Sequence, residues 1–180
     1  MGFQSHLSFF MINEYPFLSI SIIVYMDDDV WYFAYGSNLD PYQKENRTGP
    51  IREAKRARLP NYRFAFNKIK NIEEKTGYAN VMPDDGAEVW GIIFRCTKET
   101  LDQMDKYEGA PKHYRKEIVS VFTDEGDKCE AVTYVAQDGK KEDGLKPTSD
   151  YLERIVDGAR HYNLPSEYIN EIEKLADDSK

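Results

Sequence analysis

The sequence VWYFAYGSNLDP, residues 30–41, joins a strand pattern to a helix start. Val30–Tyr35 is a short apolar run, which predicts a buried strand. Asp40 followed by Pro41 is typical of a helix N-cap and a first helical turn. Gly36 between them lets the backbone come close to a ligand, and the amides after it can hold an anion or a developing oxyanion. Taken alone, the same loop also fits an ordinary strand–turn–helix corner.

The composition indicates one globular domain. The chain has 180 residues, of which 41% are hydrophobic, and this length allows a sizeable core. The formal net charge is −8, which argues against a nucleic-acid binder and against association with an anionic membrane. Cys96 and Cys129 are the only cysteines and lie in strand-like apolar runs, so we expect buried free thiols and a reducing, cytoplasmic location.

The first 25 residues differ from the rest. They contain a Phe-, Ile- and Leu-rich run without Lys or Arg, but Glu14 and Pro16 make it a poor transmembrane helix. A cationic start and a small-residue cleavage site, which a signal peptide needs, are both missing. We therefore expect residues 1–25 to be a dispensable extension or an over-called start, and residues 26–180 to form the functional domain.

The order of the expected elements predicts an α+β fold, because strands dominate first and two helices gather at the end. Strands are expected at 30–35, 53–59, 62–66, 77–82, 88–96, 114–122 and 128–136. Helices are expected from Asp40 to about Arg47, from Thr97 to about Lys106, from Thr148 or Ser149 to about Tyr162, and after Pro165. Residues 67–76 and 137–146 are polar and predict loops, the first of them mobile. Gly91 suggests a bulge or a close approach of two backbones.

Most kinds of chemical site find no support in the sequence. His6, His113 and His161 are scattered, and neither a His nor a Cys metal spacing is present, so we expect no metal. Phosphate-binding and dinucleotide-binding glycine patterns are absent, as is the Gly-x-Ser-x-Gly elbow. The basic stretch from Arg52 to Lys70 has a strand-like period and predicts a solvated face.

Glu108 is the remaining candidate for chemistry. It precedes Gly109 at the end of an amphipathic helix whose apolar face carries Leu101 and Met104, with Tyr107 as a further candidate. The negative end of the helix dipole and burial beside Tyr107 would both raise the pKa of this carboxyl group, as proton transfer near neutral pH requires. The alternative is a surface carboxylate in front of a C-cap glycine.

Read together, these segments resemble the γ-glutamylcyclotransferase family. The resemblance covers roughly residues 30–177. It is carried in order by the segments Tyr32–Leu39, Glu88–Gly91, Leu101–Gly109, Tyr114, Tyr151, Gly158-Ala159 and Leu164-Pro165. Each motif is short, and the order of the motifs makes the resemblance specific. The loops at 67–76 and 137–146 are particular to this chain and are expected to touch the leaving-group side of the pocket.

The resemblance implies a compact mixed β-barrel with flanking helices and a cavity at the Tyr-Gly-Ser-Asn loop. It implies cyclisation of a γ-glutamyl group to 5-oxoproline, with release of an amino acid or amine and without a cofactor. Glu108 would be the general base and acid. Binding residues by resemblance are Tyr32, Phe33, Ala34, Tyr35, Gly36, Ser37 and Tyr151, with Asn38 and Tyr114 as supporting candidates.

Two alternatives to a γ-glutamyl amino acid cyclotransferase stay open at this point. One is an enzyme acting on γ-glutamylamines or another γ-glutamyl-acylated metabolite, and the other is a non-catalytic small-molecule binder. The sequence does not define the leaving group. It does not define the oligomeric state either, since no segment resembles a coiled-coil seam.

Overall fold

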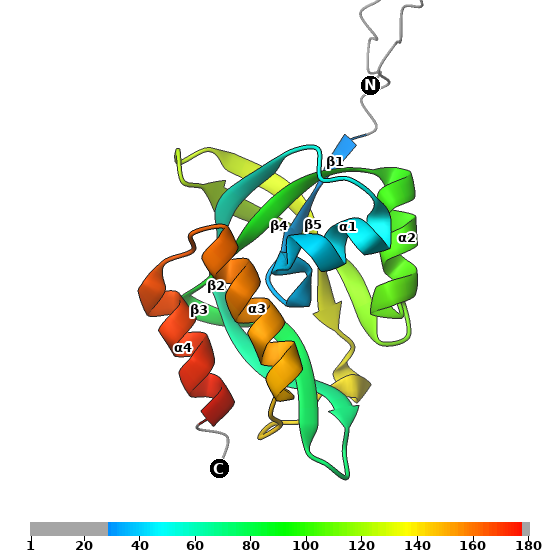
Figure 1. The fold of residues 1–180 in the computed structure, drawn as a ribbon, viewed down its shortest axis with the longest axis vertical. Helices are drawn as coiled ribbons and strands as arrows, with labels where there is room; N and C mark the ends of the chain where they lie inside the picture. The colour runs from blue at the N-terminus through cyan, green and yellow to red at the C-terminus, as the bar shows by residue number, and fades with distance from the viewer. Residues whose placement is uncertain (1–28, 178–180) are drawn as a thin grey trace, which may run out of the picture.

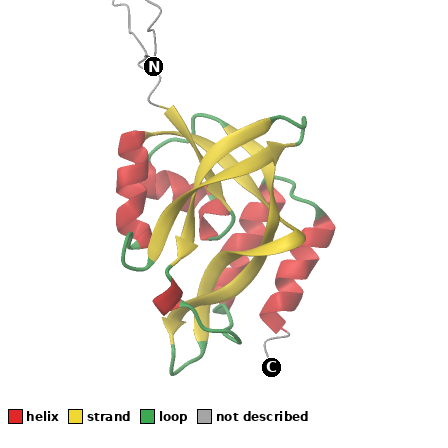
Figure 2. Cartoon of the chain, turned by 180° about the vertical axis from the view of Figure 1, so that it is seen from behind, coloured by secondary structure: helices red, strands yellow, loops and turns green. Residues whose placement is uncertain are grey.

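A closed barrel forms the centre of the computed structural model, which describes residues 29–177. Its strands are β1 (Asp29–Ala34), β2 (Ala54–Asn71), β3 (Thr76–Thr97), β4 (Tyr114–Thr123) and β5 (Lys128–Ala136). They follow the order β1-β3-β2-β4-β5, and the parallel pairing of β1 with β5 closes the barrel (Figures 1 and 2). The predicted α+β class is confirmed. The expectation for residues 1–25 concerns residues outside the described range.

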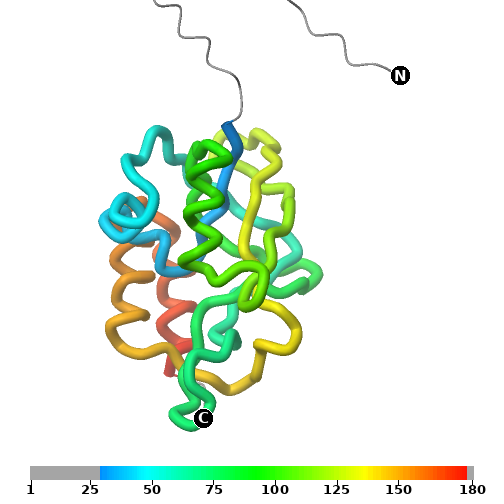
Figure 3. The backbone as a smooth tube through the Cα atoms, turned by 90° about the vertical axis from the view of Figure 1, so that its right-hand side faces the viewer, coloured from blue at the N-terminus to red at the C-terminus, as the bar shows by residue number. Residues whose placement is uncertain are grey.

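Helices flank the barrel in two pairs. They are α1 (Pro41–Thr48), α2 (Lys98–Glu108), α3 (Ser149–His161) and α4 (Ser166–Asp177). In Figure 1, α1 and α2 lie on the right of the barrel, and α3 and α4 lie beside each other on the left. Two short 3-10 segments, η1 (Ser37–Leu39) and η2 (Asp138–Lys140), complete the described elements. Turning the molecule by 90° brings α2 in front of the barrel (Figure 3).

The predicted caps of the first two helices are confirmed. The Asp40 carboxylate accepts hydrogen bonds from the backbone amides of Tyr42 and Gln43 at the start of α1. The Thr97 hydroxyl accepts one from the amide of Thr100 at the start of α2. These bonds satisfy amides that have no partner within the helix, and they set where each helix begins.

Strands β2 and β3 are longer and more continuous than the sequence suggested. The turn signals at Pro60-Asn61 and at Gly86 do not end strands but form irregularities that face each other, since the Gly86 amide donates to Asn61 Oδ1 at 3.1 Å. The loop prediction for residues 67–76 is also wrong, because Asn71 pairs with Thr76 and only a tight turn separates the strands. Local turn chemistry was overridden by pairing between the two long strands.

Two glycines let other elements approach the site. A Cβ atom at Gly91 would lie 2.3 Å from the Ala34 carbonyl oxygen, which confirms the predicted close approach of β3 to β1. A Cβ at Gly158 would lie 2.4 Å from the Leu39 carbonyl carbon, so α3 packs directly on η1. Neither contact leaves room for a side chain.

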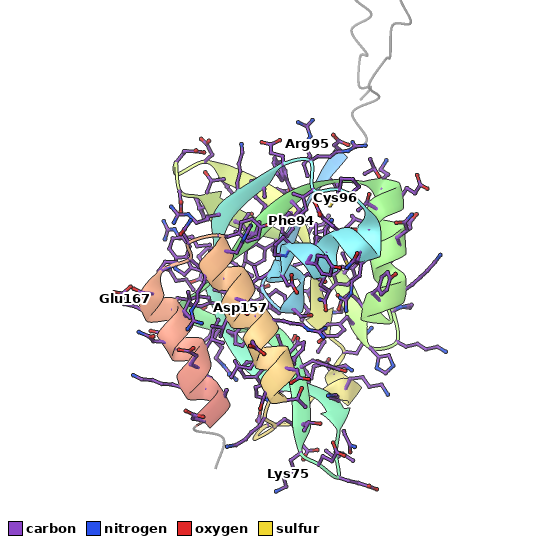
Figure 4. The ribbon with its side chains drawn as sticks, in the orientation of Figure 1. Lys75, Phe94, Arg95, Cys96, Asp157 and Glu167 are labelled. Atoms are coloured by element: carbon purple, nitrogen blue, oxygen red, sulfur yellow. The ribbon has the colours of Figure 1, made fainter. Side chains whose placement is uncertain are left out.

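Apolar side chains fill the barrel and the spaces under the helices. On β3, Phe94 and Cys96 lie where the strand passes beside α1 (Figure 4), and the Lys44 ammonium of α1 lies 5.5 Å from the Phe94 ring centroid. Leu101 and Met104 of α2 are buried as predicted, but Tyr107 is 55% exposed. The apolar face of α2 is therefore narrower than the sequence pattern suggested. Cys96 is buried and Cys129 is half-buried, and both are free thiols.

Candidate active site

Two segments seventy residues apart meet at Asn38 and Glu108. Asn38, in η1, is only 5% exposed. Its amide nitrogen Nδ2 donates to Glu108 Oε1 at 2.8 Å and to the Tyr32 hydroxyl at 2.7 Å. Gly109 follows Glu108 in the left-handed conformation (φ 63°) and ends α2 there, so the carboxylate sits at the last residue of the helix. The loop after β1 thus holds the side chain at the end of α2.

Arg47 holds the other side of Asn38. Arg47 Nη1 donates to Asn38 Oδ1 at 2.7 Å and lies 3.8 Å from Glu108 Oε1. The sequence marks Arg47 only as a basic residue in the last turn of α1, so its part in the site was not foreseen. Its position depends on the packing of α1 against α2, which no local signal encodes.

The Glu108 carboxyl group lies in a poorly solvated position. Its side chain is 16% exposed. Burial raises the pKa of Glu108 above its ordinary value, while the Asn38 hydrogen bond and the charges of Arg47 and Lys68 oppose the rise. The direction and the effect of burial agree with the expectation from the sequence, but Tyr107, the residue expected to cover Glu108, is itself exposed. The group can therefore both take up and return a proton closer to neutral pH than an exposed Glu can.

A narrow pocket of about 30 Å³, here called the inner pocket, opens beside Glu108. Tyrosine rings and the η1 loop form most of its wall. The lining residues are Tyr32, Tyr35, Gly36, Ser37, Asn38, Ala79, Glu108, Tyr114, Tyr134 and Tyr151. Burial raises the pKa of every one of these tyrosines, so their hydroxyl groups stay neutral at physiological pH.

The tyrosine hydroxyls are anchored by the barrel. Tyr114 Oη donates to the Ala79 carbonyl at 2.8 Å, and the Ala79 amide donates to Tyr151 Oη at 3.1 Å. On the opposite wall, Tyr35 Oη donates to the Tyr134 carbonyl at 2.5 Å. Because Tyr151 Oη accepts a bond from the backbone, its own O–H remains able to donate.

Backbone donors complete this wall. Within residues 29–177, the amides of Gly36, Ser37 and Asn38 have no hydrogen-bond acceptor in the protein. All three of these residues line the inner pocket. The loop therefore has donors to offer an anionic or developing oxyanionic group.

A larger cavity of about 440 Å³, here called the outer cavity, adjoins the inner pocket. The two share Ser37, Glu108, Tyr114 and Tyr151. The remaining lining is mostly polar and comprises Gln43, Arg47, Lys68, Lys70, Tyr78, Lys106, Tyr107, Gly109, His113, Thr148, Asp150 and Arg154. Glu108 thus stands at the junction between a small, aromatic, uncharged space and a wide, charged one.

The structure brings most of the predicted site residues together, and it places two elsewhere. Phe33 and Ala34 are fully buried in the core and line neither the inner pocket nor the outer cavity. The Phe33 carbonyl accepts a hydrogen bond from Thr133 Oγ1 at 2.9 Å. Both side chains belong to the buried core, and the alternation along β1 turns Phe33 to the face opposite Tyr32.

Lys68 departs from the prediction for the basic stretch. The sequence predicted a solvated face, but Lys68 is 6% exposed and lines the outer cavity. Its burial follows from the continuation of β2 through residues 67–71, the region expected to be a mobile loop. Lys70 lines the same cavity and is exposed, so only part of the stretch behaves as predicted.

Two kinds of feature are not found in residues 29–177. Between residues 29 and 177, no three His, Cys, Asp or Glu side chains gather in a geometry that could hold a metal ion. In that same range, every helix is too short or too polar to cross a membrane.

Several known proteins are similar to this chain. A family model described as the AIG2-like family matches residues 88–172. The chain is 31% identical over 148 residues to gamma-glutamylcyclotransferase of Bos taurus, covering 80% of this chain and 77% of the relative. It is 28% identical over 153 residues to gamma-glutamylcyclotransferase of Homo sapiens, covering 83% and 80%.

A solved structure titled gamma-glutamyl cyclotransferase shares the fold. The two superpose with a TM-score of 0.70 at 28% identity, covering 81% of this chain and 86% of the other. Sequence similarity over most of both chains and the shared barrel lead to the same assignment: the chain belongs to the γ-glutamylcyclotransferase family.

Proposed function

We propose that this protein is a γ-glutamylcyclotransferase, which converts a γ-glutamyl amino acid into 5-oxoproline and the free amino acid. The observation that carries the proposal is the position of Glu108. A carboxyl group with a raised pKa, held by Asn38 beside Arg47, stands where a small donor-lined pocket meets a wide cavity. Such a group can move a proton between the two ends of one substrate.

The reaction needs only proton transfer and positioning. Glu108 accepts a proton from the α-ammonium of the glutamyl group, and the freed amine attacks the γ-carbonyl carbon of the same molecule. The new C–N bond closes a five-membered ring, and the bond to the leaving amine breaks. Glu108 then returns this proton to the departing nitrogen. The ring nitrogen gives up a second proton, and the released amine takes it up and leaves as an ammonium group, so that atoms and charges balance. The attack is intramolecular, and the protein has to hold the folded conformer of the substrate.

The inner pocket and the adjoining part of the outer cavity together suit the glutamyl half, because the inner pocket alone is smaller than a glutamyl group. The hydroxyls of Tyr32 and Tyr151, which accept hydrogen bonds within the protein, and the amides of Gly36–Asn38 offer donors to the α-carboxylate and to the oxyanion that develops at the γ-carbonyl. Tyr151 and Tyr114 would fix the glutamyl group from the side of Ala79. The outer cavity then takes the leaving group.

Release of 5-oxoproline tests the proposal. The protein is incubated with a γ-glutamyl dipeptide, and 5-oxoproline is quantified for the wild type, for Glu108→Gln and for Glu99→Gln. Glu99 lies exposed in the first turn of the same helix and serves as the matched control. We expect product from the wild type and from Glu99→Gln. Product from a γ-glutamylamine but from no dipeptide would favour the first alternative, and binding without any product would favour a binder.

We also propose that residues 26–180 form the catalytic unit, in a cytoplasmic protein that needs no cofactor. The barrel begins at Asp29, close to this boundary, and the free thiols of Cys96 and Cys129 suit a reducing compartment. A chain that begins at Met26 should fold and turn over substrate like the full chain. Loss of soluble protein on this truncation would contradict the boundary.

A further inference from the structure

The outer cavity gathers positive charge on a protein that is acidic as a whole. The chain has a net charge of −8, yet five Lys and Arg residues from four elements line this cavity. They are Arg47 of α1, Lys68 and Lys70 of β2, Lys106 of α2 and Arg154 of α3. Two carboxylates, Glu108 and Asp150, face them. Like charges brought together from separate elements repel one another unless an anion joins them.

Most of these cations lack an acidic partner. Arg47 is the exception, since it lies 3.8 Å from Glu108. Arg154 donates to the neutral Gln43 Oε1 at 2.9 Å. In the part of the chain that the structure describes, no carboxylate forms an ion pair with Lys68, Lys70, Lys106 or Arg154.

Lys68 gives the strongest indication that the outer cavity binds an anion. It is 6% exposed, and its ammonium group donates to the Ile69 carbonyl at 2.9 Å. The ammonium lies over the rings of Tyr78 and Tyr114, 5.2 and 5.7 Å from their centroids. An ammonium group has three donors, and the Glu108 carboxylate acts on this one from beyond ion-pair distance. The buried charge is therefore left without a directly bonded counter-ion, which is unfavourable. Because Tyr114 also lines the inner pocket, Lys68 sits near the junction where the leaving group would begin.

We propose that the leaving group is an acidic amino acid, and that Lys68 binds one of its carboxylates while the surrounding cations bind the other. The proposal rests on the proposed function and specifies its substrate class. A leaving group with two carboxylates would match the unpaired cations, whereas a cationic amine would be repelled by them. The chemistry of the cyclisation does not change, and the released product is the free acidic amino acid.

A matched pair of substrates measures the effect of one negative charge on the leaving group. γ-Glutamyl-glutamate and γ-glutamyl-glutamine have nearly the same shape and differ by one negative charge on the leaving group. We expect kcat/KM for the acidic substrate to be higher by about 10-fold, mainly through KM, because a charge pair at a partly desolvated site has an effect of this order. Raising the salt concentration should narrow the gap, because screening weakens the exposed contributions.

Variants of the lysines that line the outer cavity test whether this cavity causes the preference for the acidic substrate. Lys68→Met removes the charge and keeps most of the side-chain volume, and Lys70→Gln tests an exposed position in case the buried change disturbs folding. Each should reduce the ratio of the two kcat/KM values by about 3-fold or more. Lys128→Met changes the net charge equally at an exposed position that lines neither the inner pocket nor the outer cavity, and it should leave the ratio unchanged.

The outcomes separate this inference from the proposed function. Equal kcat/KM for both dipeptides, with 5-oxoproline released, would overturn the charge preference and leave the cyclotransferase activity standing. Calorimetric binding of both dipeptides to Glu108→Gln measures the preference without turnover. Tighter binding of γ-glutamyl-glutamate there supports the inference even where no product forms, and equal binding contradicts it.

Discussion

The inner pocket and the outer cavity share one wall but differ in charge and in size. The inner pocket is lined by buried tyrosines whose hydroxyls stay neutral, and Glu108 is its one carboxylate. The outer cavity is wide and carries five Lys and Arg residues. A small space with neutral donors suits a part of the substrate that never varies, and a wide charged space suits a part that distinguishes one substrate from another. The contrast separates the residues that carry out the reaction from the residues that select the substrate.

The largest expected effect lies at Glu108, where the two spaces meet. Glu108→Gln keeps the shape of the side chain and removes its ability to take up a proton. We expect kcat to fall by about 10²- to 10⁴-fold, the usual contribution of a general acid–base. Release of 5-oxoproline under saturating substrate measures the change, with Glu99→Gln as the control. A variant with full activity would remove Glu108 from the mechanism.

Asn38 should come next, because it positions Glu108 from inside the inner pocket. Asn38→Leu preserves the volume and removes the hydrogen bonds to Glu108, Tyr32 and Arg47. We expect kcat to fall by roughly 10- to 100-fold through misplacement of the carboxylate. The Asn38 hydrogen bond lowers the pKa of Glu108, so the acidic limb of the kcat/KM profile should also move to higher pH. A loss of activity with an unmoved limb would indicate damage to the fold instead.

A smaller effect is expected in the outer cavity. Arg154→Gln removes a cation that donates to Gln43 and lines the cavity, without touching the inner pocket. KM for an acidic γ-glutamyl dipeptide should rise by about 2- to 5-fold, as for a partly exposed charge pair, while kcat stays the same. Steady-state kinetics at low and high salt separate the two constants. A fall in kcat with unchanged KM would mean that Arg154 takes part in the reaction and does not select the substrate.

The smallest effect concerns stability. Burial raises the pKa of Glu108, so the folded state binds its proton more tightly than the unfolded state does. The free energy of unfolding should therefore fall as the pH rises from the unfolded pKa through the folded pKa. Glu108→Gln lacks this loss, and its Tm should exceed that of the wild type by about 2–4 °C at pH 8 and match it at pH 4. Equal melting temperatures at both pH values would show that the ionised carboxylate is not destabilising.

The sequence allowed accurate prediction wherever local signals decide the structure. The cap at Asp40, the cap at Thr97 and the hairpin of β4 and β5 all depend on neighbouring residues, and all are found as expected. The turns at Pro60-Asn61 and Gly86 were misread, because pairing across two long strands turns such signals into bulges.

The candidate site divides in the same way. Glu108 and the η1 loop were predicted from a resemblance that links short motifs in a fixed order. The contact of Arg47 with Asn38 and the burial of Lys68 depend on helix packing and on strand continuity, which no single segment records. Most residues of the inner pocket could therefore be named from the sequence, with Ala79 and Tyr134 as the exceptions, whereas the positive charge of the outer cavity emerged only from the fold.

The central claim is that Glu108 transfers the proton during cyclisation and that the binding of substrate does not depend on this transfer. The most direct measurement is the rate of 5-oxoproline release from γ-glutamyl-glutamate by the wild type and by Glu108→Gln, with the dissociation constant of the same dipeptide measured for the variant. We expect a rate at least about 100-fold lower in a variant that still binds the dipeptide. An undiminished rate in Glu108→Gln would contradict it.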